Sequence, residues 1–100
     1  MIERHWKGIV KFEDAENYPN HLRQDTFKKL AALNGFVNAK ILKRDLPEGV
    51  EFMVITTWDS MEAIKQFAGY DVQTAVVPKI ANDMMIRRDA IALHYEVVDG

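Results

Sequence analysis

The chain has 100 residues, and its 13 Lys and Arg against 15 Asp and Glu give a formal net charge of −2 at pH 7. This length predicts a single domain over residues 1–100 with one modest hydrophobic core. The balanced charge provides no basic field for nucleic acid or acidic membranes, and a chain without cysteine has no disulfide or thiol chemistry. The first residues, MIERHWKG, lack an apolar signal core, and we expect a cytoplasmic protein without membrane partners.

Residues 2–12 alternate in the pattern of a first strand with two different faces. One face carries Trp6, Gly8, Val10 and Phe12, and the other carries His5, Lys7, Ile9 and Lys11. Apolar residues then recur at steps of three and four between Ala15 and Leu33, which predicts a helix. Because proline disrupts a helix interior, this helix should begin near Asn17 with Pro19 in its first turn. Asn34 and Gly35 mark its end.

Residues 36–44 and 50–58 have the composition of strands, and the four residues LPEG between them predict a tight turn. Strands joined so closely form an antiparallel hairpin. A second helix should begin near Ser60, with Asp59 as its cap and Glu62 reaching back to the amide of the cap. Its apolar stripe is Met61, Ile64, Phe67 and Ala68, and Gly69 predicts its end.

After Gly69 the segment containing Ala75, Val76 and Val77 is too apolar for a free loop, and Pro78 suits the start of a short helix. We interpret this segment as a lid or wall over a cavity. Residues 90–98 alternate again and predict a fourth strand.

The order strand, helix, strand, strand, helix, strand predicts an α+β protein of the ferredoxin-like βαββαβ type. Right-handed crossovers place both helices on one face of its four-stranded antiparallel sheet. The other face stays uncovered, and neither face would be cleanly polar. Phe52, Val54 and Trp58 alternate with Met53 and Ile55, and Val37 and Ile41 alternate with Phe36 and Leu42. An apolar face of this size favours burial against a second copy of the chain, so we expect a homodimer.

Several stretches resemble the antibiotic biosynthesis monooxygenase-like family of dimeric α/β barrels, namely LNGFVNAKILKR, EFMVITTWDSMEAIKQFAG, DVQTAVVP and HYEVV. The resemblance spans almost the whole chain. It implies two sheets that form a barrel across a dimer, with a cleft between each sheet and its own helices. Members of the family include cofactor-independent oxygenases of aromatic polyketides and haem-degrading enzymes.

The haem-degrading members use an Asn on the first strand, a Trp in the second helix and a His shortly after it. This chain has Phe67 and Val77 at the last two positions, and no Asn next to Trp6. The resemblance therefore does not extend to haem chemistry, and we expect no cofactor.

His94 is the candidate catalytic base, because a strand histidine next to Leu93 is expected to be partly buried and can titrate near neutrality. A hydrogen-bonded barrel or interface histidine is the alternative. Aromatic residues would form the walls of the substrate cleft, with core packing as the alternative role. These are Trp6, Trp58, Phe67 and Tyr95. Strand alternation places His94 and Tyr95 on opposite faces, so they cannot both line the same side of the sheet.

Other chemistry has weaker support. Ser60, the one serine, stands at a helix start where capping explains it, and His21 fits a solvated helix position. The three histidines have no metal-ligand spacing, and no glycine-rich loop indicates a nucleotide site. We predict a cofactor-independent monooxygenase acting on a small aromatic or quinol-type substrate. The alternative is a non-catalytic dimeric barrel that binds an apolar small molecule.

Overall fold

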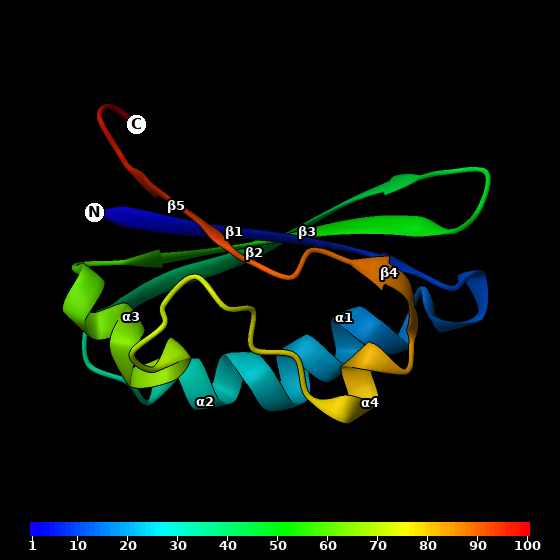
Figure 1. Ribbon diagram of the computed structural model, residues 1–100, viewed down its shortest axis with the longest axis horizontal. Helices are drawn as coiled ribbons and strands as arrows, with labels where there is room; N and C mark the ends of the chain where they lie inside the picture. The colour runs from blue at the N-terminus through cyan, green and yellow to red at the C-terminus, as the bar shows by residue number, and fades with distance from the viewer.

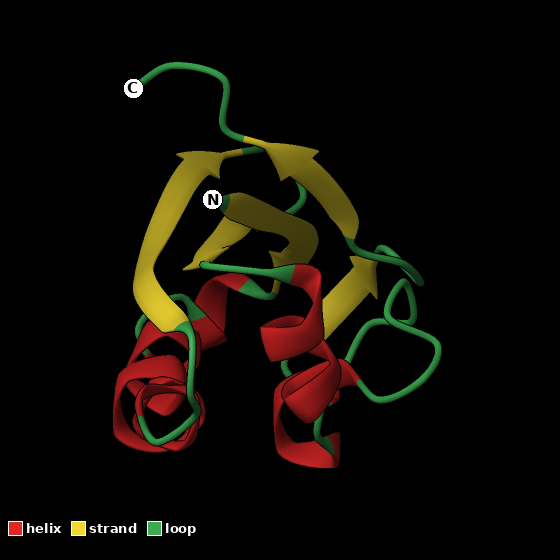
Figure 2. Ribbon diagram, turned by 90° about the vertical axis from the view of Figure 1, so that its left-hand side faces the viewer, coloured by secondary structure: helices red, strands yellow, loops and turns green.

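The computed structural model describes residues 1–100 as a curved antiparallel sheet with every helix on one of its faces (Figure 1). The strands are β1 (Ile2–Val10), β2 (Phe36–Asp45), β3 (Val50–Trp58), β4 (Met85–Arg88) and β5 (Leu93–Glu96). Their order is β2-β3-β1-β4, with β5 also paired to β1. This is the ferredoxin-like arrangement that the sequence predicts. In Figure 2 the sheet arches above the helices.

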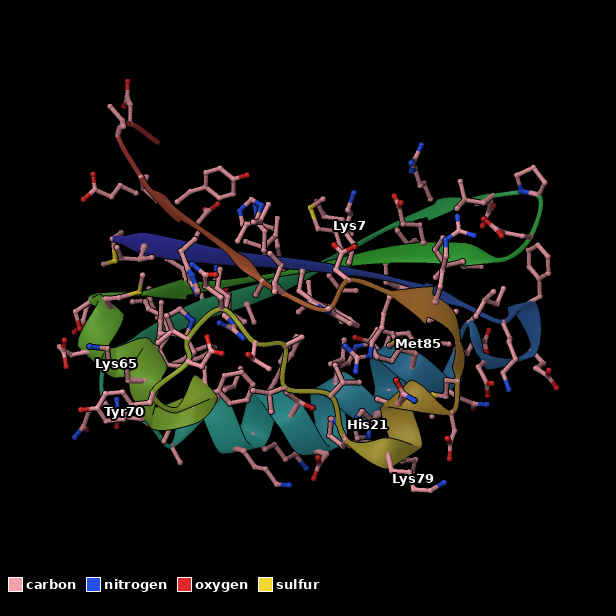
Figure 3. The ribbon with its side chains drawn as sticks, viewed as in Figure 1. Lys7, His21, Lys65, Tyr70, Lys79 and Met85 are labelled. Atoms are coloured by element: carbon pink, nitrogen blue, oxygen red, sulfur yellow. The ribbon has the colours of Figure 1, made fainter.

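Strand alternation separates the two faces of the sheet as predicted. The register pairs Trp6 with Val54 and Val10 with Val50, and the side chains of these even-numbered positions face the helices. Lys7 lies on the opposite face and points away from the helical layer (Figure 3). The hairpin between β2 and β3 closes through the predicted LPEG turn, in which Leu46 and Gly49 exchange backbone hydrogen bonds.

The first helical region begins at Asn17 with Pro19 in its first turn, as predicted. It consists of α1 (Asn17–His21), a π-helical segment (Leu22–Thr26) and α2 (Phe27–Ala31), joined without a break in helical backbone. A π turn holds more residues than an α turn, so it brings Leu22 and Phe27, five positions apart, to the same core cluster. The uniform helix expected from the sequence is therefore widened in its middle.

The second helix, α3 (Met61–Ala68), is capped by Ser60, whose Oγ accepts a hydrogen bond from the amide of Ala63 at 3.2 Å. The predicted cap at Asp59 and its reciprocal contact with Glu62 are wrong, because the chain enters the helix one residue later. Asp59 instead donates its backbone amide to the carbonyl of Gly35 at 2.8 Å. A short helix, α4 (Lys79–Asn82), follows Pro78 as predicted. None of these helices is long and apolar enough to cross a membrane.

The last strand differs from the single strand predicted over residues 90–98. β4 pairs with the end of β1 and β5 with its beginning, and residues 89–92 belong to neither strand, although the Asp89 amide still donates to Lys7. There the chain bonds to the loop before α4: Ala75 donates to Ala90 at 3.1 Å, and Ala92 donates to Gln73 at 2.7 Å. Backbone groups that a continuous strand would pair with β1 instead hold this loop against the sheet edge.

Candidate functional site

A cavity of about 70 Å³ lies between the helix-covered face of the sheet and the helices. Most of its walls are apolar, as is typical of small-molecule sites. Its walls come from β1 and β3, the first helical region, the end of α3 and the segment before and within α4. The lining residues are Arg4, Trp6, Tyr18, His21, Leu22, Thr26, Phe27, Leu30, Val54, Thr56, Phe67, Ala75, Val76, Val77, Pro78 and Ala81.

The segment of residues 75–78 forms one wall of this cavity, as predicted from its apolar composition. It is held in place by the backbone hydrogen bonds of residues 73–75 to residues 90 and 92. The interruption between β4 and β5 thus has a structural consequence. The backbone groups freed by this interruption hold the wall in place, so no helix has to pack against the sheet at this point.

Trp6 lines the cavity from β1. Its indole Nε1 donates a hydrogen bond to the carbonyl of Asp89 at 2.8 Å, which fixes the ring. A Cβ at Gly8 would come within 2.9 Å of both the Trp6 ring and the Met85 sulfur. The missing side chain at Gly8 therefore admits these two groups, so the space it leaves is already filled.

Arg4 is the charged group of the cavity, and its side chain was not singled out by the sequence. It is 5% exposed, and its guanidinium donates to the carbonyls of Val72 and Thr74. The same group stands 2.9 Å from His94 Nε2 and 5.7 Å from the centre of the Phe67 ring. Burial lowers the pKa of Arg4 from its usual range. The sequence did contain a signal for Arg4, because alternation places this basic residue on the same face of the first strand as Trp6 and Val10.

His94 does not line the cavity but stands behind Arg4 on the same sheet face. Arginine has only donors, so Nε2 of His94 accepts this hydrogen bond and the proton of the neutral ring is on Nδ1. Burial, and next the charge of Arg4, lower the pKa of His94. This geometry suits a residue that orients Arg4 better than a base in contact with substrate.

His21 lines the cavity, and the prediction of a solvated helix residue is wrong. In Figure 3 it lies in the helical layer beside α4. Its Nε2 atom is buried and has no hydrogen-bond partner. His21 follows Tyr18 by three positions, which places both on one helix face and turns His21 inward. That spacing was the signal available in the sequence.

Tyr18 adds a second polar group of the same helix face. It is 2% exposed and its ring packs edge-on against Phe52, with ring centres 5.4 Å apart. Burial raises the pKa of its hydroxyl, so this group stays protonated and can donate a hydrogen bond.

The structure brings together only some of the predicted site residues. Trp6 and Phe67 line the cavity. Trp58 is fully buried behind Phe67, with stacked rings 6.4 Å apart, and its Nε1 donates to Thr56 at 2.9 Å. Tyr95 lies on the other sheet face, half exposed, with its ring 4.9 Å from that of His5. Tyr95 therefore does not belong to this cavity. This agrees with strand alternation, which places Tyr95 on the face opposite to His94.

The fold and the cavity together define a ferredoxin-like α+β protein with a largely apolar cavity between its sheet and helices. The chain is similar in structure to a candidate antibiotic biosynthesis monooxygenase from Bacillus cereus, with a TM-score of 0.67 and 21% sequence identity. The similarity covers 100% of this chain and 94% of the other. At this identity the likeness concerns the fold. No family model matches the sequence, and no curated protein matches it significantly.

Proposed function

We propose that this protein is a cofactor-independent monooxygenase that oxidises a small, electron-rich aromatic substrate in the cavity between sheet and helices. The observation that carries the proposal is the buried, unpartnered Nε2 of His21 in a largely apolar cavity. The fold shared with a candidate antibiotic biosynthesis monooxygenase supports the same class. We propose the cytoplasm as its location, in line with a chain that contains no cysteine.

In the proposed reaction, His21 Nε2 accepts the proton of a phenol or enol held in the cavity. The resulting carbanion donates electrons to dioxygen and forms a carbon–oxygen bond. One oxygen atom becomes the new carbonyl and the other leaves as water, so a phenol and dioxygen give a quinone and water. The substrate supplies all four electrons, and the protein contributes the base and the exclusion of bulk water.

Oxygen uptake with 1-naphthol and anthrone tests this proposal. The native protein should consume dioxygen and form one quinone for each dioxygen. His21→Gln should lower the rate by about 100-fold or more, because a positioned general base contributes about that much. His5→Gln is the matched control, since His5 pairs with Glu3 on the opposite face and should keep the native rate.

Two outcomes would contradict the proposal. A native protein that consumes no dioxygen with either compound is not this oxygenase, and thermal stabilisation by the same compounds would then favour the non-catalytic binding protein. Equal rates for the native protein and His21→Gln would remove His21 from the mechanism.

We also propose that the uncovered sheet face packs against a second copy of the chain. This face has no helical layer (Figure 1), and Leu42, Leu93 and Tyr95 on it are 47%, 51% and 51% exposed. Exposed apolar groups on one face favour burial in an interface. Sedimentation at micromolar concentration should give a dimer that Leu93→Asp converts to a monomer, whereas a monomeric native protein would refute the interface.

A further inference from the structure

The guanidinium of Arg4 has donors that the protein leaves unused. An arginine side chain carries five N–H groups in a rigid fork. Three of them are directed at Val72, Thr74 and His94, so two have no acceptor in the protein. Because Arg4 lines the cavity and is otherwise 5% exposed, the cavity is where a further acceptor can be accommodated.

The charge of Arg4 is also uncompensated. None of the seven ion pairs of the chain includes Arg4, and no carboxylate lies within 4.0 Å of it. Two carbonyl dipoles and the face of the Phe67 ring offset part of the cost of burying the cation. A buried cation without an anion is costly. An anion that enters the cavity would therefore be attracted by the charge of Arg4 and could accept hydrogen bonds from its free donors.

We propose that the cavity binds ligands through an anionic oxygen, and that Arg4 is the residue that binds it. The ligand class is a small aromatic or apolar molecule that carries a carboxylate, or an enol or phenol ionised in the site. This inference rests on the proposed function for the location of the site, and it adds the substrate class. Planar guanidinium groups recognise such oxygens through two parallel hydrogen bonds.

His94 is a positioning residue in this arrangement. Its Nε2 and the carbonyls of Val72 and Thr74 accept from both N–H groups of Nη1 and one of Nη2, and so hold the fork in one orientation. Neutral His94 orients the cation without cancelling its charge, which a carboxylate at the same place would do. The site therefore keeps a positive charge for the ligand.

A matched pair of probes tests the inference, namely benzoate and benzamide, which share size and shape but differ in charge. Calorimetric titration of the native protein near neutral pH should give a dissociation constant about tenfold or more lower for benzoate, as expected for a charge-assisted hydrogen bond. Arg4→Gln should remove this preference. Arg4→Lys keeps the charge without the fork and should retain part of it.

Controls separate a specific loss from misfolding. Thermal unfolding should show that Arg4→Gln and Arg4→Lys are folded, and Lys79→Gln, an exposed cation next to the cavity wall, should keep the native preference. Equal affinity of the native protein for both probes, no binding of either, or a preference that survives in Arg4→Gln would each overturn the inference. A benzoate preference without oxygen uptake would leave it standing and refute the oxygenase.

Discussion

The layer between sheet and helices has two halves, and only one of them borders a cavity. At one end Leu30, Trp58, Ala63 and Ile64 form a closed cluster, each at most 5% exposed, and the Trp58 indole has its hydrogen-bond acceptor. Toward the other end the same sheet and the same first helical region surround a cavity, beside a second buried cluster that includes Val10 and Phe52. There the Nε2 atom of His21 and two of the five N–H groups of Arg4 have no protein partner.

The difference follows from what covers the sheet at each end. The amphipathic helix α3 covers the first end and brings its apolar stripe directly against Trp58. The cavity is covered by residues 75–78 and by Ala81 of α4, and the backbone hydrogen bonds of residues 73–75 fix this segment. The space for a ligand thus lies under an irregular covering segment, whereas the sheet under α3 is packed without such a space.

The largest expected effect is on the closed half. Trp58→Ala should lower the free energy of unfolding by about 3–5 kcal/mol, because it opens a cavity at a fully buried position. Val76→Ala in the wall of the existing cavity, at a side chain 44% exposed, should change it by about 0.5 kcal/mol or less. Denaturant unfolding measures both. Similar losses for the two variants would show that the halves do not differ in packing.

Two glycines sharpen the same contrast. Gly35 and Gly69 both have positive φ, 87° and 79°, so alanine is strained at either position, at a cost of about 1–3 kcal/mol. At Gly35 the added Cβ also comes within 2.6 Å of Ala63 in the closed half, whereas at Gly69 it meets nothing within 4 Å. Gly35→Ala should therefore lower the free energy of unfolding by about 1–3 kcal/mol more than Gly69→Ala does. A larger loss for Gly69→Ala in denaturant unfolding would contradict this order.

The smallest effect concerns pH and the open half. The pKa of folded His94 lies below its ordinary value of 6.5, so the unfolded chain binds more protons there. The contribution of neutral His94 to stability is therefore complete above about pH 6.5 and is lost as the pH falls through the folded pKa. His94→Gln should show a shallower decrease of the free energy of unfolding below that pH. Identical pH profiles for the two proteins would exclude His94 as a source of the slope.

Local patterns were sufficient for much of the fold. The alternation around Trp6, the position of Pro19 and the LPEG turn report short-range constraints on the backbone, and each was placed correctly. The cap of the second helix was misassigned because Asp59 and Ser60 are both good caps. Only the path of the chain past Gly35 decides between them.

The candidate site was less accessible from the sequence. Trp6 and Phe67 were identified from their aromatic side chains and the expected strand and helix positions. Arg4 and His21 were missed, because a polar residue on an apolar face is compatible with either solvent or a cavity until the opposite wall is known. Strand alternation showed from the sequence that Tyr95 and His94 lie on opposite faces of the sheet. It did not show which of the two faces the helices cover.

The sequence by itself determined the order of strands and helices, the two-faced sheet and its ferredoxin-like topology, because these depend on residue periodicity and turn chemistry. Only the tertiary structure decided that the last strand breaks at residues 89–92, that the π-helical segment brings Leu22 and Phe27 together, and that a cavity contains an unpaired cation. Those features depend on contacts between segments far apart in the chain. No local pattern specifies such contacts, because their energies arise only when both partners are in place.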